Sequence, residues 1–220
     1  MQKRNEHIRK LELIIEKIIE QPELHAKWLN TLSFLEHSGS RKIHKANLGK
    51  YINESILSHA SEEARHAYFF KRMMKKVLPE KSQEMNYRYS NLLLGFQAYR
   101  YFHGLDLQVY RYFKQSYKRE DLRFICYAYV TYLIEERASL VFGIYEERLK
   151  KKLPDISIMS VIKEEEKHLK EIYELLISFD PNHSENLAYL SEVEANLFEQ
   201  FLTRLEKKVL LSSEDSVLVQ

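Results

Sequence analysis

Cysteine, glycine and proline are scarce in this chain. Its 220 residues include one cysteine, Cys126, with only five glycines and four prolines. A single cysteine excludes a disulfide framework within the chain and fits a reducing compartment. The scarcity of glycine and proline, together with abundant Leu, Glu, Lys, Tyr and Ala, favours long helices over strands. The composition therefore predicts an all-α protein.

Long apolar runs and a strong net charge are also missing. No stretch approaches the roughly 20 uninterrupted apolar residues that a membrane helix needs. The first residues, 1–7, are polar and charged, unlike a signal peptide. The formal net charge is +2, with Lys and Arg spread along the chain, which gives no case for nucleic-acid binding. We expect a cytoplasmic protein without a membrane segment or a nucleic-acid partner.

The spacing of apolar residues predicts a series of helices without a domain boundary. No linker rich in Pro, Gly or Ser divides residues 1–220, so we expect one domain. Four predicted helices can form a bundle, and an aromatic-rich stretch, expected to form two helices bent at Gly104, would supply a long crossover. The predicted ranges are 23–46, 51–77, 118–152 and 156–178 for the bundle, 85–103 and 106–117 for the crossover, 5–19 and 186–211 for extra terminal helices, and 212–220 for a loose polar tail.

Two Glu-x-x-His units stand far apart in the sequence. Glu63 and His66 form the first, and Glu165 and His168 form the second. Positions i and i+3 of an α-helix lie on the same face, so both side chains of a unit can reach one point in space. Each unit lies within an apolar stripe, where a carboxylate is costly unless it is paired or coordinates a metal. The two units predict a metal site; the alternative is buried Glu–His pairs without metal.

Further acidic residues complete the candidate site. Glu36 is the one acid on the apolar stripe of the first bundle helix, although it also fits a surface position, and Gly39 one turn later would leave space beside a metal. The third bundle helix offers Glu135 or Glu136, and periodicity slightly favours Glu136. Four carboxylates and two imidazoles suit iron or manganese, and four acids balance two divalent ions. Two nearby side chains are expected to hydrogen-bond the ligands: His59 and Tyr132.

The order of these acids and histidines resembles the ferritin-like di-iron carboxylate superfamily. The resemblance covers about residues 23–178 and implies a ferritin-like four-helix bundle with a long helical crossover, to which the terminal helices are extra. It also implies two iron ions, or manganese in one or both positions. The implied ligands are two terminal carboxylates, two bridging carboxylates and one histidine for each metal: Glu36 and Glu135, Glu63 and Glu165, His66 and His168.

Two shorter matches are more local. The segments 133–135 (Leu-Ile-Glu) and 161–165 (Val-Ile-Lys-Glu-Glu) are similar to the corresponding helices of the aldehyde-deformylating oxygenases. The segment 134–137 (Ile-Glu-Glu-Arg) is similar to the Ile-Glu-Ala-Arg motif of the tRNA-hydroxylating di-iron enzymes. Both resemblances place the ligand at Glu135 rather than at Glu136.

We therefore expect a non-haem di-iron oxidoreductase of the hydroxylase or monooxygenase type. It would use dioxygen to oxidise an organic small molecule. The chain has no flavin, nicotinamide or cysteine-cluster motif, so the electrons would come from an external donor. The alternatives are a ferritin-like iron-handling protein, acting as a ferroxidase or peroxide scavenger, and a metal-free helical scaffold. The substrate, the metal pair and the oligomeric state, including a homodimer, stay open.

Overall fold

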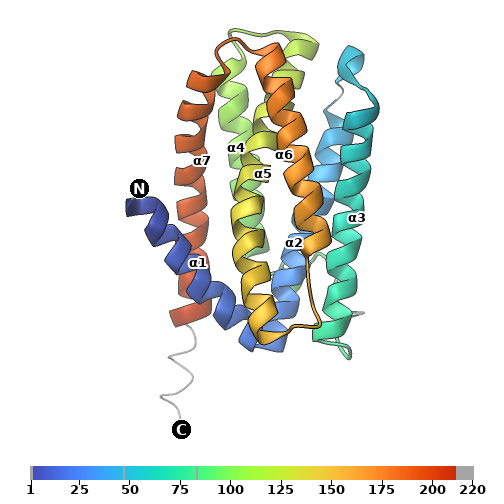
Figure 1. The fold of residues 1–220 in the computed structure, drawn as a ribbon, viewed down its shortest axis with the longest axis vertical. Helices are drawn as coiled ribbons and strands as arrows, with labels where there is room; N and C mark the ends of the chain where they lie inside the picture. Colours follow the sequence, from blue (N-terminus) through green and yellow to red (C-terminus); the bar gives the residue numbers. More distant parts are fainter. Residues whose placement is uncertain (1, 47, 83, 212–220) are drawn as a thin grey trace.

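The computed structural model describes residues 2–46, 48–82 and 84–211, and these fold into helices joined by loops (Figure 1). Within this part of the chain there are seven α-helices and no strand, which confirms the predicted all-α bundle. None of the described helices is both long enough and apolar enough to cross a membrane. The helices are α1 (Gln2–Glu20), α2 (Pro22–Lys45), α3 (Glu54–Val77), α4 (Gly95–Phe113), α5 (Arg119–Lys152), α6 (Met159–Phe179) and α7 (His183–Glu206), with short turns η1 (Gly49–Tyr51), η2 (Tyr89–Asn91) and the π-helical η3 (Lys207–Leu211).

Helices α2, α3, α5 and α6 form the four-helix bundle (Figure 1). Helix α2 packs against α3, and α5 packs against α6, as two antiparallel hairpins. Helices α3 and α5 run in the same direction, so the chain must cross the length of the bundle between them. Helix α4 makes that crossing and packs against α5 and α7.

The buried apolar side chains form two clusters, one toward each end of the bundle. In α3, Ile56 and Ala60 belong to one cluster, and Phe70 and Met73 belong to the other. The polar Glu-x-x-His unit lies between them. The other three bundle helices follow the same division, which leaves a polar layer at mid-height between two apolar cores.

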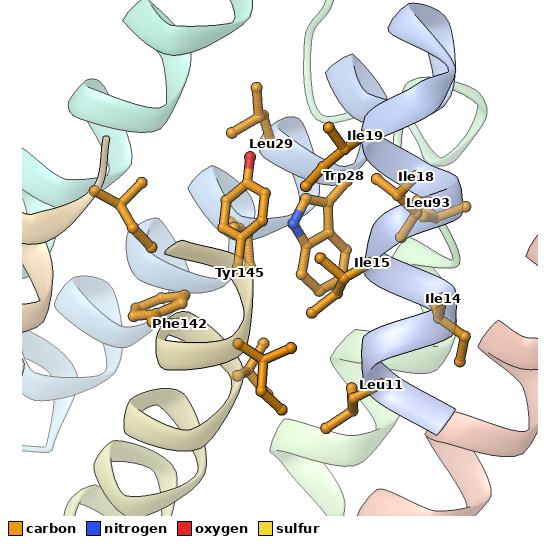
Figure 2. Packing of buried hydrophobic residues seen from close by; sticks show 14 of the residues in the cluster. Leu11, Ile14, Ile15, Ile18, Ile19, Trp28, Leu29, Leu93, Phe142 and Tyr145 are labelled. Atoms are coloured by element: carbon orange, nitrogen blue, oxygen red, sulfur yellow. The ribbon is translucent and has the colours of Figure 1, made fainter. Parts of the chain in front are cut away.

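Helix α1 covers the core at one end of the bundle (Figure 2). Its side chains Leu11, Ile14 and Ile15 are fully buried. They pack near the rings of Trp28 and Tyr145, which meet edge to face with centroids 6.2 Å apart. Burial of each aliphatic side chain contributes about 2 kcal/mol, so α1 is an integral part of the core.

The crossover differs from its prediction. Instead of two helices bent at Gly104, one helix continues through this residue from Gly95 to Phe113. A β-carbon at Gly104 would lie 3.5 Å from Cδ2 of Leu197 in α7, an ordinary contact distance. Gly104 therefore marks the place where α4 and α7 pack together, and it is no helix break.

The segment before α4 was expected to be helical, but side chains of α2 hold its backbone in a loop. The backbone N–H of Leu93 donates to Oγ1 of Thr31 at 2.8 Å. Asn30 donates to the carbonyl oxygens of Asn86 and Asn91, both at 2.9 Å. These bonds satisfy backbone groups that a helix would otherwise pair.

The ends of α6 and α7 also differ slightly from the predicted ranges. Helix α6 begins at Met159 rather than at residue 156, because the buried carboxylate of Glu146 accepts hydrogen bonds from the Ile158 N–H at 2.8 Å and the Ser157 hydroxyl at 2.9 Å. Helix α7 begins at His183, and its last turn continues as η3. The predicted tail over 212–220 lies outside the described residues.

Candidate metal centre

The six predicted ligands lie together in the polar layer of the bundle. Five of them are buried, and Glu36 is half-buried. Helix α2 supplies one side chain, α3 two, α5 one and α6 two. The i, i+3 spacing of each Glu-x-x-His unit places both of its side chains on the face that points into the bundle. The residues are Glu36, Glu63, His66, Glu135, Glu165 and His168.

Their ligand atoms fall into two overlapping groups. Within each group, one nitrogen or oxygen atom from each residue lies within 4.8 Å of the others. Glu63 belongs to both groups, as a carboxylate shared between two metal ions would. Glu165, expected as a second bridge, belongs to one group only, and His59 supplies the fourth atom of the other. The first ligand set is Glu36, Glu63, His66 and Glu165; the second ligand set is His59, Glu63, Glu135 and His168.

The structure distinguishes Glu135 from Glu136. Glu135 is 3 % exposed and belongs to the second ligand set, whereas Glu136 points to solvent. The slight preference of periodicity for Glu136 is therefore wrong. Its physical reason is that the neighbours of Glu135 on the inner face, Thr131 and Ala138, line cavities. Small side chains that border a cavity give a weaker apolar signal than side chains packed into a core.

The histidine of each Glu-x-x-His unit is held by a carboxylate of the opposite helix. His66 Nε2 lies 2.6 Å from Glu164 of α6, and His168 Nε2 lies 2.6 Å from Glu62 of α3. An Nε2–H that donates to a carboxylate leaves Nδ1 as the atom that faces the ligand sets. This is the usual way in which a protein fixes the tautomer and the orientation of a metal-binding histidine.

Four buried polar atoms of the centre make no hydrogen bond within the described part of the chain. Nearly all buried polar atoms of native proteins have a hydrogen-bond partner, so four atoms without one in one place require an explanation. Two of them, His66 Nδ1 and Glu165 Oε1, lie 2.8 Å apart as an ion pair when His66 is protonated, without the geometry of a hydrogen bond. Metal ions would take all four as ligands, so these residues fit the predicted metal pair. The atoms are His66 Nδ1, His168 Nδ1, Glu135 Oε2 and Glu165 Oε1.

Without metal, the carboxylates perturb one another. Burial and the neighbouring carboxylates raise the pKa of Glu36 and of Glu135 well above their usual value. Burial alone would lower the pKa of His66, but adjacent carboxylates outweigh it and raise this pKa to about 9. Burial alone would raise the pKa of Glu165, but Glu135 and His66 lower it to about 2. The metal-free centre thus retains protons that bound metal would displace.

His59 connects the centre with a tyrosine that the sequence did not single out. Its Nε2 lies 3.1 Å from Glu135 Oε1, and its Nδ1 lies 3.0 Å from the hydroxyl of Tyr127. Burial raises the pKa of Tyr127, so the phenol stays neutral. With metal on Nε2, Nδ1 of His59 would carry the ring proton and donate it to the Tyr127 oxygen. The expectation for Tyr132 is not met: its ring packs 5.7 Å from that of Tyr173, and within the described residues no hydrogen bond joins it to a ligand residue.

Sequence reasoning also missed Glu62 and Glu164, which orient the histidines. A signal for them is present: both units read Glu-Glu-x-x-His, at 62–66 and 164–168. The first glutamate of each unit turns toward the neighbouring helix, while the second faces the centre. The presence of a second glutamate at the same position in both units was the sequence signal for Glu62 and Glu164.

Loss of the Glu164 carboxylate, which contacts His66, is expected to weaken metal binding. In Glu164→Gln, the neutral amide no longer makes the His66 imidazole more basic, so we expect metal affinity to fall roughly tenfold or more. Competitive titration with cobalt(II) measures the change. Glu166→Gln, an exposed neighbour on the same helix, serves as the matched control. Equal affinities in the two variants would show that the contact with His66 has no role in binding.

Gly39 leaves room for the shared carboxylate. A β-carbon at this position would lie 2.7 Å from Oε2 of Glu63, which is too close for both atoms to keep their places. We therefore expect Gly39→Ala to displace Glu63 and to lower metal affinity roughly tenfold, about 1.4 kcal/mol.

The control is Gly143→Ala on an exposed face of α5, where a β-carbon meets no atom within 4 Å. This variant should keep its metal and gain roughly 0.5–1 kcal/mol of stability, because alanine favours a helix interior. Metal titration and thermal unfolding separate the two effects. Unchanged metal affinity in Gly39→Ala would contradict the role of Gly39.

Two cavities reach the centre. The large cavity, about 550 Å³, lies between α2, α4 and α5 and ends at His59, Glu63 and Glu135. The small cavity, about 110 Å³, lies toward the other core and touches Glu36 and Glu165 as well as Glu63 and Glu135. Its other walls are mainly aliphatic and aromatic side chains. The buried centre is therefore open to small molecules on two sides.

Comparison with known proteins assigns no family to this chain. No protein-family model, no curated protein and no solved structure matches it. The case for a function therefore depends on the geometry and chemistry of the centre itself.

Proposed function

We propose that this protein is a non-haem oxidoreductase that binds two iron ions and uses dioxygen to oxidise an organic substrate. The observation that carries the proposal is the pair of buried ligand sets that share Glu63. Carboxylate oxygens with a few imidazole nitrogens suit iron and manganese, so a manganese or mixed pair is the alternative metal content. The order of the ligands along α2, α3, α5 and α6 supports kinship with the ferritin-like superfamily.

The two ligand sets would hold the iron ions, which when reduced would supply the electrons that dioxygen requires and that side chains do not provide. The residues of the chain supply the setting. Glu36 and Glu135 would bind from opposite hairpins, and Glu63 belongs to both sets. Glu62 and Glu164 hold the histidines in position.

The large cavity favours an organic substrate over iron handling alone. Its volume of about 550 Å³ is within the usual range for small-molecule sites, and it opens directly onto the second ligand set. A ferroxidase that acts only on iron has no need of such a space. The external electron donor and the cytoplasmic location stay predictions from the sequence.

Oxygen uptake by the iron-loaded protein tests the proposal. The protein is reconstituted with ferrous iron without oxygen, desalted, analysed for metal, and then mixed with oxygenated buffer. We expect about two iron ions per chain, and uptake of oxygen that Glu63→Ala/Glu165→Ala abolishes along with the iron. If the protein binds two metal ions but consumes no more oxygen than the buffer alone, the proposed activation of oxygen is contradicted.

A further inference from the structure

One face of α5 forms a wall of the large cavity over more than four helical turns. Residues at intervals of three and four, from Arg119 to Glu135, line it. At 1.5 Å per residue this wall is about 24 Å long. The second ligand set lies at its inner end. The middle of the cavity is apolar, with side chains such as Ile43, Phe102 and Val130.

The outer end of the cavity carries positive charge. Lys42, Lys45, Arg119 and Arg123 line it, and Asp106 is the one acidic side chain among its lining residues at this end. Lys42 already pairs with Asp106. Among the described residues, no carboxylate lies within ion-pair distance of Lys45 or Arg119.

The backbone at this opening is unusual. Arg119 has φ of 50°, in the left-handed region that residues with a β-carbon rarely adopt. Strained residues of this kind tend to occur at binding sites, where the surroundings hold them in place. Arg119 is also the first residue of α5, whose preceding residue, Lys118, makes no side-chain cap.

We propose that the large cavity binds an elongated organic anion, a carboxylate with an apolar chain, with the carboxylate at Lys45 and Arg119 and the apolar end directed toward the metal centre. In the metal-free centre, the opposite orientation would place the anion against the acidic side chains of Glu63 and Glu135. With or without metal, it would also leave Lys45 and Arg119 without a partner. That this anion is the substrate depends on the proposed function; that it binds does not.

Binding of dodecanoate and of dodecanol, measured by titration calorimetry on the full chain with and without metal, tests the inference. The two probes share the apolar chain and differ in charge. We expect one dodecanoate per chain, bound roughly tenfold more tightly than dodecanol, because two cations contact its carboxylate. Lys45→Gln/Arg119→Gln should remove this preference. The control Lys75→Gln/Lys76→Gln removes two exposed charges at the far end of the bundle and should preserve it.

A second variant tests whether the chain lies inside the cavity. Val130→Phe fills the apolar middle and should abolish binding of both probes while the helical circular dichroism and the metal content stay unchanged. Equal affinity for the two probes in the wild type, a preference that survives in Lys45→Gln/Arg119→Gln, or full binding in Val130→Phe would each overturn the inference.

The same experiment separates this inference from the proposed function. If the protein holds two metal ions but does not prefer dodecanoate, the inference fails and the proposed function stands. If it prefers dodecanoate but binds no metal, the proposed function fails and the anion site stands.

Discussion

Glu63→Ala is expected to remove both metal ions, whereas Glu36→Ala and Glu135→Ala should each weaken one of the two sites. The reason is that Glu63 provides a ligand atom to both ligand sets, while Glu36 belongs to the first and Glu135 to the second. Elemental analysis after desalting should give about two metal ions per chain for the wild type, close to none for Glu63→Ala, and about one for each of the other two variants.

The matched control is Glu136→Ala, because Glu136 follows Glu135 on the same helix but points to solvent. It should retain the wild-type metal content. A Glu63→Ala protein that keeps both metal ions would refute the shared carboxylate, and loss of metal in Glu136→Ala would refute the assignment of Glu135.

The metal-free protein is expected to lose stability as the pH rises. In the metal-free centre the pKa of His66 is raised from 6.5 to about 9, so its contribution to stability is fully present below pH 6.5 and is lost as the pH rises through about 9. This shift corresponds to about 3 kcal/mol, or about 10 °C in melting temperature for a chain of this size. The raised pKa values of Glu36 and Glu135 act in the same direction above pH 4.5.

The gap in melting temperature between metal-loaded and metal-free protein is the quantity to measure, at several pH values from about 6.5 to about 9. It should widen by about 10 °C over this range, because a metal-bound His66 does not titrate. Lys71, whose pKa burial lowers to about 8, contributes equally to both forms and cancels in the gap. Glu165, with its pKa lowered to about 2, loses its contribution only in acid.

His66→Gln is the control for this measurement, since the variant lacks the titrating imidazole. Its metal-free form has no His66 imidazole to deprotonate, so it should not show this loss of stability between pH 6.5 and about 9. A gap that stays constant with pH in the wild type would show that the carboxylates around His66 do not hold a proton there.

The four bundle helices were predictable because local signals agree with the tertiary structure. Pro22 begins α2, and Asn53 caps α3 by accepting from the Ile56 N–H at 3.0 Å. The crossover was not predictable, because its loop is fixed by Asn30 and Thr31, more than fifty positions away in the sequence. No local pattern reports such hydrogen bonds.

The candidate centre was also only partly predictable from local sequence patterns. The i, i+3 spacing inside apolar stripes was sufficient to bring Glu63, His66, Glu165 and His168 together. The crossed contacts of Glu62 and Glu164 depend on how α3 and α6 face each other, which sequence spacing on either helix does not specify. The choice of Glu135 needed the position of a cavity, which is also a property of the packed structure.

The most direct test of the dinuclear centre is an anomalous-scattering map at the iron edge from crystals of the iron-reconstituted protein. The two ligand sets predict two peaks, one within each set, on either side of the Glu63 carboxylate. A map with no peak between α2, α3, α5 and α6, from protein in which all the ligand residues are intact, would contradict the metal centre and leave a helical bundle whose Glu–His contacts are structural.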